Sequence, residues 1–202
     1  MKNLLLIALP LLLAGGVRAQ DDRLEKKRFN TGFNIGINKA NVITSSNSPD
    51  MAIQNGMGFR MGLISSFAFT KRFSVEPKLE LSLNAANVSF ENEEYRVNPA
   101  DLEMILHFRR KFFKGGFSPY IIAGPNVKVP LPGRYAMILP TRQDVAIDVG
   151  VGLDVPFGKK IRVAPELRYS FGLLNISESS TVNDLKFHNV ALVLNIGGRP
   201  RL

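Results

Sequence analysis

Apolar and polar residues alternate without a break along residues 144–156, DVAIDVGVGLDVP. Branched aliphatic residues fill most of the apolar positions, and Asp, Ala or Gly occupies nearly every position between them. A period of two residues is that of a β-strand with two unlike faces. Strands of ordinary soluble sheets are depleted in Asp and Gly. The polar face of this predicted strand therefore requires an unusual environment.

The same alternation recurs along the rest of the chain, and no helical period of comparable strength competes with it. The eight predicted strands cover residues 29–38, 57–69, 73–83, 101–109, 117–127, 144–156, 161–171 and 190–196.

The connections between these strands alternate in length. ANVITSSNSPDMAIQNG, NAANVSFENEEYRVNP, VPLPGRYAMILPTRQ and GLLNISESSTVNDLK are long, whereas TKR, RKFFKGG and PFGKK are short. This order is typical of outer-membrane barrels, which have short periplasmic turns and long external loops. The sequence therefore predicts an all-β fold, an eight-stranded antiparallel up-and-down transmembrane β-barrel of OmpA/OmpX-like size.

A membrane barrel accounts for the two faces of each strand. In lipid the sheet must close so that no backbone group stays unpaired, and the aliphatic face then meets acyl chains. The narrow interior of eight strands is filled by side chains, where glycine leaves room and opposite charges can pair. Ten charged residues of nearly balanced sign fall on the polar faces, and we predict that they form a lumen charge network: Arg60, Glu76, Lys78, Glu80, Glu103, Asp148, Asp154, Arg162, Glu166 and Arg168.

The alternative is a soluble barrel of lipocalin type, with the apolar face inside around a ligand. Alternation alone does not distinguish the inside from the outside of a barrel. The glycine and paired charge on the polar face favour the membrane barrel over a freely solvated exterior.

The N-terminus has the pattern of a secretory signal peptide. Lys2 precedes an apolar run from Leu4 to Ala14, and Val17-Arg18-Ala19 offers small residues at a cleavage position. The run is too short to span a membrane. We expect a signal peptide at 1–19, a periplasmic segment at 20–29, an outer-membrane barrel at 30–197 and a C-terminal tail at 198–202.

Composition narrows the classes of function. Hydrophobic residues make up 45% of the chain and charged residues 21%, which excludes a disordered chain. The chain has no cysteine, so Cys-ligated metal sites are excluded. The formal net charge of +9 becomes +7 once Lys2 and Arg18 are removed. An exported chain rarely meets nucleic acid, so we expect no nucleic-acid partner.

Candidate catalytic chemistry is sparse. His107 and His188 are the only histidines, and His107 falls among charges on a polar face, which favours a hydrogen-bonded lumen residue over a catalytic base. A phosphate-binding Gly-rich loop, a G-x-S-x-G elbow and an H-E-x-x-H motif are all absent from the sequence. We expect no enzyme activity, cofactor, metal or small-molecule substrate, and a charge-filled interior also argues against a diffusion pore.

Charge is segregated between the two kinds of connection. The long loops sum to −2, whereas the predicted periplasmic turns sum to +8. The basic turn residues are Lys71, Arg72, Arg109, Arg110, Lys111, Lys114, Lys159 and Lys160. These residues either snorkel at the membrane rim or dock acidic surfaces of other envelope proteins.

Two segments match at a spacing of 88 residues, TKRFSVEPKLELSL (70–83) and GKKIRVAPELRYSF (158–171). Each contains a proline at the same place, Pro77 and Pro165. Proline cannot donate to a sheet ladder, so each predicts a bulge or an unpaired position near a rim. Convergence among strands of one barrel suffices to explain the repeat.

The stretches VEPKLELS, FSPYIIAGPN, VGVGLDV, VAPELRYSFGLLNI and NDLKFHNVALVLNI resemble the PorT-like outer-membrane β-barrels of Bacteroidetes, over roughly residues 30–197. The P-E-L-x-Y-S strand indicates only this broad family. Its combination with G-L-x-N-I, a long loop and a strand beginning D-L-K is similar to the PorT/SprT subgroup. The chain departs from such barrels at its end, IGGRPRL, where an aromatic residue is usual.

The resemblance implies a non-enzymatic protein of the outer membrane that supports type IX protein secretion and gliding. Its implied partners are outer-membrane lipid and other envelope proteins of the secretion system. One alternative is a generic small barrel that acts as an adhesin or stabilises the envelope. Another is a lipid-modifying barrel enzyme.

Overall fold

The computed structural model describes residues 29–44, 52–90, 93–97, 100–113, 117–131, 138–139, 142–158, 161–176 and 185–198. The predicted signal peptide, residues 20–28 and the tail 199–202 lie outside these ranges. Within them, no helix is long and apolar enough to cross a membrane.

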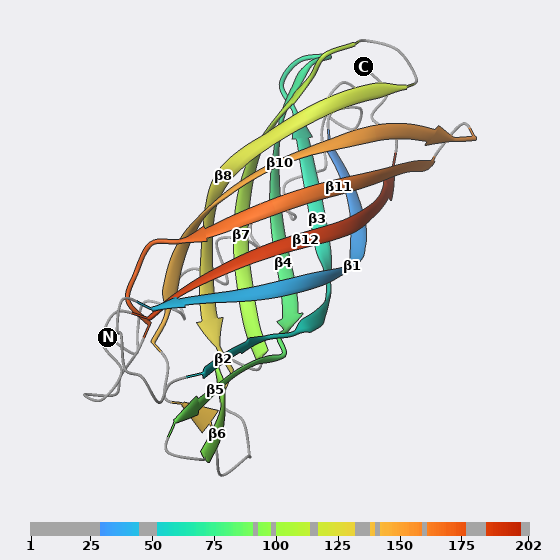
Figure 1. Cartoon of the computed structure of the whole chain (residues 1–202). Coiled ribbons are helices and arrows are strands. Elements are labelled where there is room, and N and C mark those ends of the chain that lie inside the picture. The colour runs from blue at the N-terminus through green and yellow to red at the C-terminus, as the bar shows by residue number, and fades with distance from the viewer. Residues whose placement is uncertain are drawn as a thin grey trace.

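Eight strands form a closed antiparallel barrel, which confirms the predicted fold (Figure 1). They are β1 (Phe29–Thr44), β3 (Met57–Ala68), β4 (Phe73–Leu83), β7 (Ala100–Lys111), β8 (Ser118–Pro130), β10 (Asp144–Phe157), β11 (Ile161–Gly172) and β12 (Leu185–Gly198). Each strand pairs with its neighbours along the chain, and β1 pairs with β12 from Gly32↔Gly197 to Thr44↔Leu185. In Figure 1 the blue β1 therefore lies beside the red β12, and the sheet has no free edge.

The connections of the barrel alternate in length as predicted. Short connections join β3 to β4, β7 to β8 and β10 to β11, and the long ones leave from the opposite end. The long connections also contain a second sheet, which the sequence did not predict. Its strands pair in the order β2 (Ala52–Asn55), β5 (Ala86–Phe90), β6 (Glu93–Val97) and β9 (Ile138–Leu139).

This second sheet joins segments from three different long connections, and in Figure 1 β2, β5 and β6 extend beyond one end of the barrel. β5 and β6 form a hairpin, β2 adds antiparallel to β5, and β9 adds parallel to β6. Its strands have two to five residues, too few for an alternating pattern to be recognised.

The two faces of the barrel strands differ in chemistry and in exposure. On β10, Asp148 is fully buried in the barrel interior, whereas Val151 on the opposite face is 55% exposed. On β11, Glu166 and Arg168 are 1% exposed and Leu167 between them is 51% exposed. Such an apolar outer face around a whole barrel is what acyl chains cover. The core of this molecule is therefore its charged interior.

Of the two alternatives predicted for the strand prolines, the structure shows an unpaired position and not a bulge. The register of β3 against β4 is unchanged on either side of Pro77, and only the positions between Ile64↔Lys78 and Phe67↔Val75 lack pairing. Pro165 interrupts the pairing of β10 with β11 in the same way. Each proline lies within its strand and points to the outer face, and it interrupts the ladder without shifting the register.

Candidate functional site

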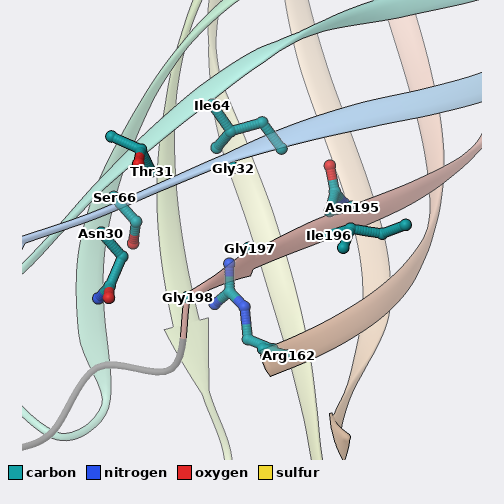
Figure 2. A pocket seen from close by; sticks show the side chains of 10 residues that line it. All are labelled: Asn30, Thr31, Gly32, Ile64, Ser66, Arg162, Asn195, Ile196, Gly197 and Gly198. Carbon is teal, nitrogen blue, oxygen red and sulfur yellow. The ribbon is translucent and has the colours of Figure 1, made fainter. Parts of the chain in front are cut away.

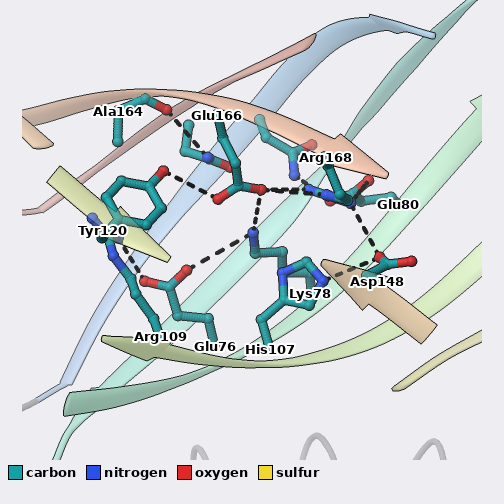
Figure 3. Close-up of polar contacts among 12 residues, drawn as sticks. Glu76, Lys78, Glu80, His107, Arg109, Tyr120, Asp148, Ala164, Glu166 and Arg168 are labelled. Atoms are coloured by element: carbon teal, nitrogen blue, oxygen red, sulfur yellow. Dashed lines mark hydrogen bonds and ion pairs between the residues drawn. The ribbon is translucent and has the colours of Figure 1, made fainter. Parts of the chain in front are cut away.

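The barrel interior contains the main concentration of charged groups in the described chain. All ten residues assigned to the lumen charge network point inward from β3, β4, β7, β10 and β11, and each is at most 7% exposed. They lie on these strands because every second residue of a strand points to the same face. Ion pairs link them into a continuous network, part of which Figure 3 shows.

Glu80 occupies the centre of one half of this network. Its carboxylate lies 3.2 Å from Nη1 of Arg60 and 3.0 Å from Nη1 of Arg168. Arg60 reaches on to Glu103, with Nη2 3.1 Å from the Glu103 carboxylate. A single buried acid thus binds two guanidinium groups from different strands.

Glu166 is the corresponding centre of the other half. Its Oε1 lies 3.3 Å from Nζ of Lys78 and 3.0 Å from Nη2 of Arg168. The Tyr120 hydroxyl donates to Oε2 at 3.1 Å. Figure 3 shows these three groups converging on Glu166. Three donors on one carboxylate satisfy the acceptor capacity that a buried charge needs.

The 88-residue repeat determines which charges meet. Lys78 and Glu166 hold equivalent places in the two matched segments, and so do Glu80 and Arg168. β4 and β11, which contain these segments, lie four strands apart in the closed order and face each other across the lumen. Equivalent positions thus carry opposite charges and pair across the barrel. Convergence of strand sequences does not account for this complementarity, so the sequence interpretation of the repeat was incomplete.

Arg109 was assigned to a periplasmic turn, and the structure corrects this assignment. β7 continues beyond Phe108 to Lys111, and its side chains still alternate in orientation there, so Arg109 points inward with 1% exposure. Arg109 forms ion pairs with Glu76, at 2.8 Å, and with Asp154. Its guanidinium carbon also lies 3.6 Å from the ring centroid of Tyr120. Arg109 therefore belongs to the lumen charge network.

Lys111 requires a similar correction. It ends β7 and forms an ion pair with Asp154, so it lies at the mouth of the barrel and not in the turn. Arg162 approaches the same Asp154 at 3.6 Å and Glu76 at 3.5 Å. The network consequently runs from the centre of the barrel to the end that carries the short turns.

Of the other predicted turn residues, Lys71 and Arg72 are exposed in the connection 69–72. The backbone of this turn is held by the Thr70 hydroxyl, which accepts from the amides of Arg72 and Phe73. Arg110 points outward, with its guanidinium carbon 5.6 Å from the Phe73 ring centroid. Lys114, Lys159 and Lys160 lie outside the described residues.

His107 is fully buried inside the barrel, where its Nε2 lies 3.1 Å from the Asp148 carboxylate. Asp148 also lies 3.8 Å from Nη1 of Arg168. The imidazole is thus one more hydrogen-bonding group of the network. In the described ranges, no group of three His, Asp or Glu side chains is placed to hold a metal ion.

Comparison with known proteins assigns the chain to a family. Residues 18–178 match the family described as outer membrane protein beta-barrel domain. The chain belongs to this family. It is an integral β-barrel protein of the outer membrane, and its short turns therefore face the periplasm. No curated protein matches the chain.

Solved structures of outer-membrane barrels share this fold. The crystal structure of Neisserial surface protein A has a TM-score of 0.58 at 13% identity, over 84% of this chain and 96% of that chain. The structure of OprG from Pseudomonas aeruginosa has a TM-score of 0.52 at 12% identity, over 84% of this chain and 93% of that chain. At these identities the similarity concerns the fold alone.

Several inward-facing neutral residues of the outer-membrane barrel were missed as members of the network. Asn34 donates to Glu80 at 2.6 Å, and Asn126 donates to Glu103 at 2.8 Å. Lys128 was also missed, although it lies inside the barrel with Nζ 3.9 Å from the Asp144 carboxylate. Their place in the period-two pattern was a usable signal, since each alternates with outward apolar residues.

Little open space remains in the outer-membrane barrel. Gly152 lies against the Tyr120 ring, where a Cβ atom would collide with the ring. A small recess opens at the periplasmic mouth, and Figure 2 shows Asn30, Ser66 and Arg162 around it. Side chains and ion pairs fill the interior beyond it, as expected for eight strands. The charge network therefore closes the lumen.

Proposed function

We propose that this outer-membrane barrel is a non-enzymatic component that supports type IX protein secretion and gliding, as PorT-like barrels are implied to do. The observation that carries the proposal is the basic periplasmic end of a barrel whose lumen is closed. A closed lumen leaves the two rims as the surfaces available to partners. Cations at the periplasmic rim suit acidic surfaces of other envelope proteins.

The structure reduces the size of this basic surface. Arg109 lies in the lumen and Lys111 at its mouth, so six of the eight predicted turn cations remain. Of these six, Lys71, Arg72 and Arg110 lie in the described residues. Arg109 and Lys111 are neutralised by acids, whereas Lys71 and Arg72 are exposed. The docking surface thus centres on the β3–β4 and β10–β11 turns.

The residues that carry the family resemblance have structural roles. Within P-E-L-R-Y-S, Glu166 and Arg168 hold the lumen network, and Leu167 and Tyr169 face outward. This motif therefore has a structural role in the barrel wall. The secretion role rests instead on the periplasmic turns.

Charge reversal in these turns tests the proposal. K71E/R72E/K159E/K160E is expected to abolish display of type IX cargo at the surface of a host that secretes such cargo, because the reversed rim repels acidic partners. The unboiled gel mobility of the barrel should remain that of the folded protein. The charge-preserving variant K71R/R72K/K159R/K160R is the matched control and should keep secretion. Normal cargo display by the reversed variant would reject docking and leave snorkelling at the rim as the role of these residues.

A second candidate function, adhesion, is favoured by the sheet β2-β5-β6-β9. Three long connections combine in it on the external side of the barrel, which gives the loops a common structured surface. Replacing residues 86–97 by a short Gly-Ser linker should abolish surface adhesion and leave cargo secretion unchanged if this candidate holds. Loss of secretion with adhesion unchanged would reject it.

A further inference from the structure

The lipid-facing surface of the barrel carries very few charged groups. Within the described strands, its titratable side chains are Lys39 on β1, Arg110 on β7, and Lys186 and His188 on β12, with no acid among them. Arg110 lies at the periplasmic rim. The other three lie together on the neighbouring strands β1 and β12. The two lysines and the histidine that lie together on these two strands are the feature that needs explanation.

The pairing of β1 with β12 places these three side chains side by side. Asn41 is opposite His188, while Lys39 is opposite Val190 and Ile43 is opposite Lys186. Lys39 and Lys186 are therefore separated by four residues along the strand direction, about 13 Å. Lysine stems are long enough for both ammonium groups to reach a ligand between them.

The depth of these residues is that of the external membrane interface. β12 begins at Leu185 and β1 ends at Thr44, so the cluster lies at the end of the barrel that carries the long loops. Toward the periplasm the same outer face continues with Ile35, Ile37 and Leu192, all exposed. Lys39 and Lys186 thus lie toward the external end of the band that meets acyl chains, with Ile43 still exposed opposite Lys186, which is the depth of the interface with the headgroups.

The side chains around His188 hold its imidazole in place. Its Nδ1 lies 2.9 Å from the Tyr169 hydroxyl, and the Phe171 ring centroid is 5.3 Å from that of His188. His188 itself is only 9% exposed, so the imidazole lies beneath the surface that the two lysines flank. Neither Lys39 nor Lys186 forms an ion pair with an acid in the part of the chain that the structure describes. We name Lys39, Lys186, His188 and Tyr169 the outer-rim cluster.

We propose that the outer-rim cluster binds the phosphate groups of a phosphorylated glycolipid of the outer leaflet. Two lysines that have no acidic partner in the described residues complement a phosphate, which lysine binds as a point charge. The adjoining apolar residues favour a lipid over a soluble anion, because the acyl chains of the bound molecule would cover Ile35, Ile37 and Leu192. The site is independent of the periplasmic turns and of secretion.

Reconstitution of the full chain tests the site. The wild-type barrel would be folded into phosphatidylcholine vesicles that contain bisphosphorylated lipid A, and the lipid retained would be measured by native mass spectrometry after extraction into detergent. K39Q/K186Q is expected to bind this glycolipid about 30-fold more weakly, since each interfacial lysine contributes roughly 1 kcal/mol. R110Q/K71Q removes two cations at the opposite rim and should bind like the wild type. K39R/K186R keeps both charges and should also retain the lipid.

Three results on lipid retention would overturn the proposal, in addition to the competition result below. The first is equal retention of lipid A by K39Q/K186Q and the wild type. The others are retention of the dephosphorylated glycolipid, or of phosphatidylglycerol, by the wild-type barrel as strongly as it retains lipid A. Displacement of lipid A by millimolar inorganic phosphate would likewise reject a headgroup site in favour of a free-phosphate site. Unboiled gel mobility verifies the fold of each variant, and K39Q and K186Q are compared singly if the double variant does not fold.

Discussion

The inner and outer faces of the same strands are stabilised by opposite means. On β11, inward Glu166 and Arg168 are held by ion pairs, whereas outward Leu167 is placed against lipid. Removing one partner of an ion pair destabilises the inner face, whereas adding a charge destabilises the outer face. Because the side-chain period is two, a slip by one residue would exchange the faces completely. The register is therefore fixed both by the ion pairs on the inner face and by the lipid on the outer face.

Glu166→Leu should produce the largest effect of these predictions, because it removes a buried acid that binds three side chains of the inner face. Lys78 and Arg168 would each lose a partner, and the Tyr120 hydroxyl would lose its acceptor. Leaving buried charge uncompensated costs about 3–5 kcal/mol. The free energy of unfolding would be measured by urea titration in vesicles, with the folded fraction read from unboiled gel mobility.

The double variant Lys78→Met/Glu166→Leu is the control for this prediction. It removes both partners of one pair, so its loss should be smaller than the sum of the two single losses. If Glu166→Leu unfolds at the same urea concentration as the wild type, the ion pairs are not what stabilises the interior.

Val151→Arg tests the outer face at the middle of β10. Val151 is 55% exposed and pairs with Ile121 on β8 and Leu167 on β11, both of which also face outward. An arginine near the bilayer midplane costs about 2–4 kcal/mol. The same urea titration measures this loss, and Val151→Leu should remain close to the wild type. Normal folding of the arginine variant together with misfolding of the leucine variant would mean that the faces are inverted.

Gly152→Ala should have the smallest effect of the three, and it tests how tightly the interior is filled. Its Cβ atom would collide with the Tyr120 ring, and overpacking of this kind costs about 1–3 kcal/mol. Gly197→Ala serves as the control, since the nearest atom to its Cβ would be the Thr31 carbonyl oxygen at 3.3 Å. An equal loss of stability in both variants would point to a general glycine effect and away from the contact with Tyr120.

Most of the barrel could be predicted from the sequence because every strand has one face toward lipid and one face toward the charged interior. The period-two pattern located all eight strands and separated their faces. The end of β7 could not be located from the pattern. Residues 109–111 are Arg-Arg-Lys, so the apolar/polar alternation stops after Phe108, although in the structure the strand continues to Lys111 and Arg109 still points inward. Which of these three cations enters the lumen depends on the acids that face it, Glu76 and Asp154.

The ion-pair partners and the second sheet were beyond the reach of local patterns. β9 has two residues and pairs with β6 from another connection, so its formation depends on tertiary contact. The pair Lys78–Glu166 joins residues 88 positions apart across a closed barrel. Opposite charges at equivalent places of the repeat were visible in the sequence, yet their meeting depends on β4 and β11 lying four strands apart.

The ion pairs between opposite walls also constrain how the chain enters a membrane. Lys78–Glu166 and Glu80–Arg168 join β4 to β11, so neither pair can form in a sheet that is still open. An open sheet that entered lipid would carry these charges unpaired, which is costly at the bilayer centre. We therefore expect the strands to keep their inner faces in water until β1 meets β12, so that insertion and closure of the barrel are coupled.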